Sequence, residues 1–503
     1  MFEKVLITPH LILNKFFGYS NFREGQLEIV NNILAKKDTL AILPTGGGKS
    51  ICFQIPALIF GQNKNDPRTT IVISPLISLM KDQVDALNRK GIPACYINSS
   101  MSKNKQQEIY KLIESDPTKN ENSIKIIYVS PERLKSTKFI SVIKKIKIGM
   151  LVVDEAHCIS QWGSDFRPHY KQIADFYQHI NKDIVKVAFT ATANKIIQDE
   201  ICTTLKLTNP FIYLKSFSRN NLFLEVIKCE SETIKNLVML RILDQHSGQT
   251  GIIYCATRKA TENLVNFLQT FNIFATRYHG AVDKKEKEEI QNSFINGKIK
   301  LIIATNAFGM GIDKSDVRFI IHYQIPGNIE NYYQEIGRAG RDGKPSNCYS
   351  LFYVDDIKIQ MSFAQNNKES SVQTKINLQK LQQIYKLFKT KECRTNIILN
   401  YFGEATQKRC HNCDNCKEQV FKHKEPKHAL LTKVSESEMA LIKKLLLQKY
   451  MQKKPTTFLT DTEICYLSVI KPNNKIDSMK IPGLGTGWAN KWWKTVAPVI
   501  NTK

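Results

Sequence analysis

The feature that most constrains the fold is a series of short apolar, β-branched runs that alternate with amphipathic helical patterns. In the first part of the chain these runs, typical of buried parallel strands, cover 39–43, 70–74, 124–129, 150–153 and 185–190. Helical patterns such as 79–88 and 103–114 separate them. Strands that alternate with helices form βαβ units, so the sequence predicts an α/β fold with a doubly wound parallel sheet.

The same pattern then starts again, with strand-like runs at 251–255, 275–278, 300–304 and 319–322. We therefore predict two α/β domains, 1–207 and 208–355, with a cleft between their facing edges. After residue 355 the composition becomes helical and polar. The predicted remainder is a helical, cysteine-bearing subdomain over 356–420, a linker over 421–434 and a small all-α domain over 435–503.

The charge of the chain narrows the class of partner. Against 46 Asp and Glu stand 72 Lys and Arg, a formal net charge of +26. Such an excess favours a polyanion, most often nucleic acid, although a lysine-rich surface without a partner would have the same composition. The longest apolar runs, such as 51–60, are too short to cross a bilayer, and residues 1–4 do not begin an export signal. We expect no membrane partner and a cytoplasmic protein, at the nucleoid in a bacterium or in the nucleus of a eukaryote.

A glycine-rich stretch lies between the first predicted strand and the helix after it, where a phosphate-binding loop belongs. Its nucleotide-binding residues are predicted to be Thr45, Gly46, Gly47, Gly48, Lys49 and Ser50. Glycines let backbone N–H groups approach phosphates, a lysine reaches the β- and γ-phosphates, and a serine hydroxyl binds Mg²⁺. Leu43 stands where the strict loop pattern has a glycine, a departure usual in motor ATPases.

Two carboxylates follow the strand 150–153 directly. Asp154 is predicted to hold Mg²⁺, directly or through water, and Glu155 to orient and deprotonate an attacking water. An incidental acidic turn is the alternative, but the loop at Lys49 needs such a partner. The two residues are therefore predicted to be catalytic.

The second predicted domain carries Arg338 and Arg341 within the stretch 334–343. At positions i and i+3 the two arginines are expected on one face of a helix. One can act as an arginine finger on the γ-phosphate while the other couples the domains. A solvated basic face is the alternative, which the nucleotide motifs upstream disfavour.

These stretches together closely resemble the RecQ family of superfamily 2 DNA helicases, over residues 10–420. The resemblance implies two tandem RecA-like domains and adds Gln334 to the catalytic residues, with Arg341 as the better finger candidate. The stretch 17–26 resembles the adenine-reading motif of the family. It assigns Gln26 to the edge of the adenine base, with Tyr19 and Arg23 packed against the base.

Further motifs of the family appear in the expected order. The stretch 74–83, which begins at Ser74, resembles the motif that tracks the DNA strand, and 189–193 resembles the coupling motif at the end of the first domain. The stretch 304–313 resembles the motif that touches nucleotide and DNA, which implies a nucleotide contact for Asp313.

The most family-specific stretch is 158–170, directly after the acidic pair. Trp162, Phe166 and Arg167 form an aromatic and cationic loop able to stack on unpaired bases. In RecQ-like enzymes this loop links DNA contact to ATP hydrolysis. Ser164 stands where the family usually has histidine, which weakens the expectation for coupling strength. An aromatic cluster that packs the domain is the alternative.

Four of the twelve cysteines are grouped, at Cys393, Cys410, Cys413 and Cys416, whereas the others lie mostly in apolar segments and are typical of small buried side chains. Four thiolates at this spacing can close a tetrahedral Zn²⁺ site or hold an iron–sulfur cluster. In the RecQ family the spacing marks the zinc-binding subdomain, so the resemblance implies Zn²⁺. A reducing compartment is consistent with one metal site and no disulfides.

RecQ enzymes commonly continue into a winged-helix domain, for which the interval after Cys416 is too short. The tail instead resembles an HRDC domain, a helical DNA-binding module, through 458–461, 471–472 and 481–485. Trp488, Trp492 and Trp493 either stack on bases or pack the core of this small domain.

The leading hypothesis is an ATP-dependent DNA helicase whose cofactors are ATP, Mg²⁺ and Zn²⁺. The resemblance adds 3′→5′ polarity, a role in recombination or repair, and single-stranded, 3′-tailed or forked DNA as partner. The alternatives are an RNA helicase or nucleic-acid translocase with weak unwinding, and a non-hydrolysing binding protein. We expect a monomer; protein partners are not indicated.

Overall fold

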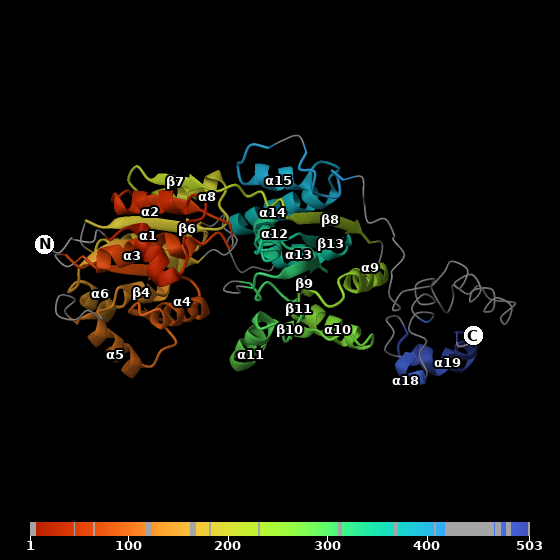
Figure 1. Ribbon diagram of the computed structural model, residues 1–503. Coiled ribbons are helices and arrows are strands. Elements are labelled where there is room, and N and C mark those ends of the chain that lie inside the picture. Colours follow the sequence, from red (N-terminus) through yellow and green to blue (C-terminus); the bar gives the residue numbers. More distant parts are fainter. Residues whose placement is uncertain are drawn as a thin grey trace.

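The computed structural model describes residues 7–44, 46–63, 66–115, 123–160, 167–180, 183–229, 232–309, 314–365, 371–406, 409–417, 467, 474–478 and 484–500. Two α/β domains lie side by side, and a helical subdomain lies above the second sheet (Figure 1). The predicted Thr45, Trp162, Phe166 and Asp313 lie outside the described residues, as does the expected linker 421–434.

The first domain is built on a parallel sheet of seven strands within the described residues, in the order β3-β4-β2-β5-β6-β1-β7. The chain runs from β1 through β2 to the edge strand β3 and then returns across the sheet, and all pairs are parallel. The strands are β1 (Thr39–Ile42), β2 (Thr69–Ile73), β3 (Ala94–Ile97), β4 (Ile126–Val129), β5 (Ile148–Val153), β6 (Val185–Thr190) and β7 (Phe211–Leu214).

Helices cover the first sheet, and their apolar faces and the buried strands β1, β4, β5 and β6 make the core. The α-helices are α1 (Pro9–Ile12), α2 (Gln26–Leu34), α3 (Lys49–Gly61), α4 (Ile77–Arg89), α5 (Lys103–Ile113), α6 (Thr137–Ile143), α7 (Ile173–Tyr177) and α8 (Lys195–Thr204). The shorter turns are the π-helix η1 (Leu13–Phe17) and the 3₁₀ segments η2 (Pro131–Lys135), η3 (Ala156–Ile159) and η4 (Pro168–Gln172).

The second domain repeats this plan with a parallel sheet in the order β10-β11-β9-β12-β13-β8. Its strands are β8 (Leu222–Lys228), β9 (Thr250–Tyr254), β10 (Thr276–Tyr278), β11 (Leu301–Ala304), β12 (Val317–His322) and β13 (Ser346–Phe352). Its helices are α9 (Glu232–Gln245), α10 (Arg258–Gln269), α11 (Lys284–Ile295) and α12 (Ile329–Ile336). Two parallel-sheet domains in series confirm the predicted fold class.

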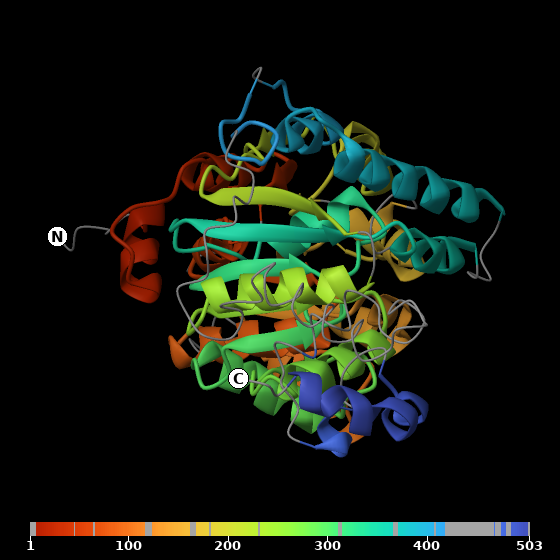
Figure 2. The same cartoon turned by 90° about the vertical axis from the view of Figure 1, so that its right-hand side faces the viewer.

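Three helices follow the second sheet and form the helical subdomain, seen from the side in Figure 2. They are α13 (Asp356–Gln365), α14 (Ser371–Lys389) and α15 (Arg394–Tyr401). Near the C-terminus the described helices are α18 (Lys475–Ser478) and α19 (Thr486–Ile500). The half-buried Trp488, Trp492 and Trp493 pack against an apolar cluster, while most of the tail resemblance to an HRDC domain falls outside the described residues. In the described part of the chain we find no helix that is long and apolar enough for a membrane span.

Strands β3, β7, β8 and β13 have no counterpart among the runs predicted from sequence. Three of the four are edge strands, which need no continuous apolar run because one side or end meets solvent. Strand β7 alternates half-buried and exposed residues. It pairs with β1, so the first sheet extends to Leu214, past the boundary predicted at 207.

Candidate nucleotide site and metal centre

The predicted phosphate-binding loop joins the buried strand β1 to the N-terminus of α3. Gly46 and Gly48 both have φ of 79°, a left-handed conformation that glycine adopts without strain. Lys49 begins α3, and its Nζ lies 3.4 Å from the carbonyl oxygen of Leu43. A helix N-terminus with glycines before it presents backbone N–H groups to an anion, so the local geometry suits a phosphate.

Two residues of the predicted adenine-reading stretch contact this loop directly. Arg23 Nη1 donates to the Gly46 carbonyl at 2.7 Å, and Gln26 Nε2 lies 3.2 Å from the Gly48 carbonyl. The Gln26 side chain also accepts a hydrogen bond from the Arg23 backbone N–H at 2.8 Å. The Tyr19 side chain is 52% exposed beside them. The stretch 17–26 and the loop thus lie in direct contact.

Asp154 follows β5 and lies in the interior of the same site. Its carboxyl has a pKa raised to about 7, chiefly by burial and also by the neighbouring Glu155 carboxylate, while Lys49 lowers it. A half-buried carboxyl held beside a lysine and the phosphate loop suits a divalent cation, whose charge would favour the ionised form. Glu155 itself has φ of 47°, an uncommon conformation outside glycine.

A chain of polar contacts leads from the acidic pair to the second domain. His157 Nδ1 lies 3.3 Å from Glu155 Oε2 and 3.0 Å from the Thr190 hydroxyl. The Thr192 backbone N–H donates to that hydroxyl, and Gln334 Nε2 of α12 donates to Thr192 Oγ1 at 3.2 Å. Sequence reasoning identified both motifs but assigned no role to the side chains of His157, Thr190 and Thr192, which only the fold brings together.

The two predicted arginines do not lie on a helical face. Helix α12 ends at Ile336, and Arg338 and Arg341 occupy the turns after it, where Gly340 has φ of 55°. The expected i, i+3 helical spacing was wrong because glycines end the helix. Arg338 is buried and donates to the Gly309 carbonyl inside the second domain.

Arg341 instead reaches the first domain. A Cβ atom placed on Gly46 would lie 3.4 Å from both Cγ and Cδ of Arg341. The side chain therefore lies against the phosphate-binding loop, and the cleft between the domains is closed at this point. The structure thus places the two arginines differently, whereas before it only the family resemblance favoured Arg341 as the finger.

The predicted DNA contacts are only partly described. Arg167 Nη1 donates to the Pro75 carbonyl at 2.8 Å, directly after Ser74, which is 1% exposed. Tyr170 donates from its hydroxyl to the Asp154 carbonyl at 3.0 Å. The stretch around Arg167 and Tyr170 is thus attached both to the strand-tracking motif and to the acidic pair.

The four grouped cysteines converge in the helical subdomain. Cys393 precedes α15, and Cys410, Cys413 and Cys416 lie in the loop after it. Their sulfur atoms all lie within 4.8 Å of one another. A tetrahedral Zn²⁺ site with Zn–S bonds of about 2.3 Å needs sulfurs roughly 3.8 Å apart, so a small adjustment of these thiolates would complete it.

The metal loop is fastened to the second sheet. Arg394 and Asp414 form a buried bidentate ion pair, with Nε–Oδ1 and Nη2–Oδ2 distances of 2.6 and 2.8 Å. Asp414 also accepts from the Val226 backbone N–H at 2.9 Å, and Cys413 forms a parallel bridge with Leu224. The loop thereby covers part of the edge strand β8.

Comparison with known proteins follows the same division of the chain. The family model of DEAD/DEAH box helicases matches residues 23–199, the helicase conserved C-terminal domain matches 232–343, and the RecQ zinc-binding domain matches 354–417. The fold and the site thus define a two-domain superfamily 2 helicase with a zinc centre.

Relatives specify the family within this class. The ATP-dependent DNA helicase RecQ of Bacillus subtilis is 43% identical over 80% of this chain. A protein of Acanthamoeba polyphaga mimivirus that carries the name of an ATP-dependent RNA helicase is 38% identical over 96% of the chain and 85% of its own length. The chain belongs to the RecQ family of superfamily 2 ATP-dependent helicases, as the resemblance implied, and its four grouped cysteines lie within the matched zinc-binding domain.

Other comparisons set the limits of these likenesses. The matched region covers 66% of the Bacillus subtilis protein and 61% of the RecQ helicase of Pasteurella multocida. Among solved structures, Saccharomyces cerevisiae Dbp5 bound to RNA and ADP BeF3 has a TM-score of 0.56 at 19% identity, covering 75% of this chain and 98% of that one. That likeness concerns the fold of the two domains.

Proposed function

We propose that the chain is an ATP-dependent DNA helicase that moves 3′→5′ along single-stranded DNA and separates the duplex ahead of it. The observation that carries the proposal is the closed nucleotide site, where Arg341 of the second domain lies against Gly46 of the first. A site completed by both domains can open and close with each nucleotide, and such closure is what converts hydrolysis into movement.

Within this proposal each residue of the first-domain site has a distinct role in binding or hydrolysing ATP. The Gly46–Gly48 backbone and Lys49 bind the phosphates, and Gln26, Arg23 and Tyr19 bind the base. Mg²⁺ would be held by Ser50 and Asp154, and when bound it neutralises charge on the β- and γ-phosphates. Glu155 orients and deprotonates the attacking water.

The residues of the second domain act on the same phosphate from the other side. Arg341 stabilises the charge that develops on the γ-phosphate, while Arg338 supports the turn from within its own domain. Gln334, through Thr192, senses whether the cleft is closed. We assign Asp313 and Thr45 to the nucleotide by family resemblance alone.

DNA binding is proposed along the stretch that begins at Ser74 and in the loop that holds Trp162, Phe166 and Arg167. Aromatic and cationic side chains there would stack on unpaired bases without reading sequence. The proposed substrates are single-stranded, 3′-tailed or forked DNA, and the proposed role is in recombination or repair. The proposed location is the cytoplasm, at the nucleoid in a bacterium, or the nucleus in a eukaryote. We propose a monomer whose first domain runs past 207 to include β7, followed by a second domain that ends at 355, a subdomain at 356–420 and an HRDC-like module at 435–503.

The decisive experiment is ATP turnover with single-stranded DNA, with RNA and without polymer, followed by unwinding of matched duplexes with a 3′ or a 5′ tail. We expect turnover to rise with DNA and the 3′-tailed duplex alone to separate. Absence of DNA-stimulated turnover would contradict the proposal. Separation of the 5′-tailed duplex would contradict only the polarity.

An RNA helicase or a translocase with weak unwinding is the second candidate. The name of the mimivirus relative, of which the chain covers 85%, favours RNA. Turnover stimulated by RNA more than by DNA would select the RNA helicase. Turnover stimulated by DNA without strand separation would select the translocase.

A further inference from the structure

The turn that carries Arg341 is held by residues outside its own motif. We call residues 337–344 the arginine turn. Arg219 Nη2 donates to the carbonyl oxygens of Ala339 and Gly340 at 2.9 and 3.2 Å. Asn221 Nδ2 donates to the Gly340 carbonyl at 2.8 Å and to that of Lys344 at 3.0 Å. The turn is therefore hydrogen-bonded, on both sides of Arg341, to the segment that enters the second domain.

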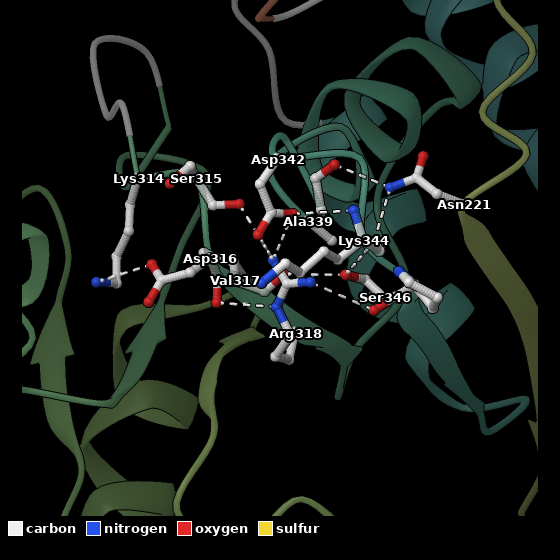
Figure 3. A network of polar contacts seen from close by, with 12 residues as sticks. Asn221, Lys314, Ser315, Asp316, Val317, Arg318, Ala339, Asp342, Lys344 and Ser346 are labelled. Carbon is white, nitrogen blue, oxygen red and sulfur yellow. Dashed lines mark hydrogen bonds and ion pairs between the residues drawn. The ribbon is translucent and has the colours of Figure 1, made fainter.

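The fit between this segment and the turn is close. Gly340 has φ of 55°, and a Cβ atom placed on it would lie 2.4 Å from Asn221 Nδ2. Only glycine leaves room there for the asparagine amide. Figure 3 shows the Asn221 amide directed at the turn from one side.

A second attachment holds the turn from the opposite side. Arg318 of β12 forms an ion pair with Asp342, in which the single nitrogen Nη2 lies 2.7 and 2.8 Å from Oδ1 and Oδ2 (Figure 3). The Gly340 N–H donates to the Val317 carbonyl at 2.9 Å. The position of the residue between them, Arg341, is thus determined by contacts on both sides of the turn.

The segment that holds the turn is itself fixed by the zinc subdomain. Glu404 accepts from the Ser216 hydroxyl at 2.5 Å and from the Phe217 N–H at 2.9 Å. The Phe217 ring stacks on Phe402 with centroids 4.2 Å apart. Asn412 Nδ2, beside the zinc ligands, donates to the carbonyls of Asn220 and Leu222 at 2.8 and 2.9 Å. Residues 215–221, which join the two domains, are therefore not a free hinge at this end.

We propose that Arg219 and Asn221 are positioning residues for ATP hydrolysis, which hold Arg341 at the phosphate-binding loop and connect its placement to the zinc subdomain. The inference rests on the proposed function, because it assumes that Arg341 acts on the γ-phosphate. It predicts an effect on turnover and none on ground-state binding, since a catalytic group displaced by about 1 Å can lose up to 100-fold in rate.

A double-mutant cycle tests the inference. DNA-stimulated kcat is measured for the full chain, Arg219→Ala, Arg341→Ala and the double variant. For each protein we also measure the zinc content, the affinity for a non-hydrolysable ATP analogue and the affinity for single-stranded DNA. We expect Arg219→Ala to lower kcat about tenfold, with the other readouts unchanged. Because Arg219 acts through Arg341, the kcat of the double variant should equal that of Arg341→Ala within about twofold.

Controls separate positioning from general damage. Lys298→Ala, which removes an exposed charge of the same domain, should leave kcat unchanged. If Arg219→Ala merely reduced the amount of folded protein, it would lower kcat by the same factor in the unmodified chain and in Arg341→Ala. Equal factors in the two proteins would therefore overturn the inference. An unchanged kcat in Arg219→Ala would overturn it as well. If Arg219→Ala does not fold, Asn221→Ala takes its place in the same cycle. Absence of turnover in the unmodified chain instead rejects the proposed function.

Discussion

The amide nitrogen Nε2 of Gln334 lies 3.2 Å from the hydroxyl oxygen of Thr192, and this hydrogen bond joins the two α/β domains. Gln334 belongs to α12 of the second domain, and Thr192 follows β6 of the first. Thr192 is completely buried, and its N–H donates to Thr190, which contacts His157. His157 in turn lies 3.3 Å from Glu155, so a change at the cleft reaches the acidic pair through four short contacts.

Gln334→Ala removes this contact and should weaken the closed cleft. A neutral hydrogen bond contributes about 1 kcal/mol, so we expect DNA-stimulated kcat to fall roughly fivefold with little change in ATP-analogue affinity. Steady-state ATPase assays provide the measurement. Gln245→Ala, on an exposed position of α9, is the matched control. Unchanged turnover in Gln334→Ala would show that the contact has no part in closure.

Lys49→Ala should abolish hydrolysis and leave DNA binding intact. The lysine begins α3 beside the phosphate loop, whereas the proposed DNA contacts lie elsewhere, so its removal affects the phosphates first. We expect turnover to fall at least about 100-fold, as for other preorganised cationic groups. ATPase assays and DNA-binding titrations at low salt test both halves, with Lys298→Ala as control. Loss of DNA binding would refute this division between the sites.

Cys413→Ser should release zinc and loosen the helical subdomain. Cys413 is fully buried and bridged to Leu224, so the loss affects both the metal and the edge of the second sheet. Metal analysis should find one equivalent of zinc in the unmodified chain and substantially less in the variant, together with a lower melting temperature. Cys202→Ser, outside the cluster, should retain the metal. A brown protein that contains iron would instead identify an iron–sulfur cluster.

Arg394→Met should be strongly destabilising. The substitution leaves the buried Asp414 carboxylate without its countercharge. Removal of one partner of a buried ion pair lowers the free energy of unfolding by about 3–5 kcal/mol. Urea unfolding followed by circular dichroism and by zinc release should show the subdomain unfolding earlier. Arg89→Met, at the exposed end of α4, serves as the control. Equal stability of the two variants would mean that the pair is dispensable.

Asp356 should make stability depend on pH. It is buried at the start of α13 and paired with Lys235 at 2.7 Å, and burial raises its pKa to about 6. The folded state therefore binds a proton that the unfolded state has released, so the contribution of Asp356 to stability is full below about pH 4 and is lost as the pH rises through 6. Between pH 5 and 7.5 the loss is about 1 kcal/mol.

Asp356→Asn removes this titration. As the pH rises from 5 to 7.5, the unfolding free energy of the unmodified chain should therefore fall by that amount relative to that of the variant. Urea titrations at several pH values give the measurement. A difference that does not vary with pH would show that Asp356 keeps an ordinary pKa.

Contiguous motifs were predictable because their chemistry is local. The spacing of Gly46, Gly48 and Lys49 reflects how a backbone wraps a phosphate, and three of the four zinc ligands lie within seven positions of one another, from Cys410 to Cys416. Buried central strands such as β5 were also visible, since both faces are apolar. Edge strands such as β7 were not, because half of each meets solvent.

What the sequence by itself determined is the inventory: two α/β domains, a phosphate loop, an acidic pair, two arginines and four thiols. Only the tertiary structure decided which arginine crosses to Gly46 and which stays against Gly309. It also decided that Arg219, which is distant in sequence from both arginines, holds the turn that carries them. The reason is physical: a motif follows from the bonding of neighbouring residues, whereas a contact between distant residues depends on how whole sheets and turns pack, which no short pattern records.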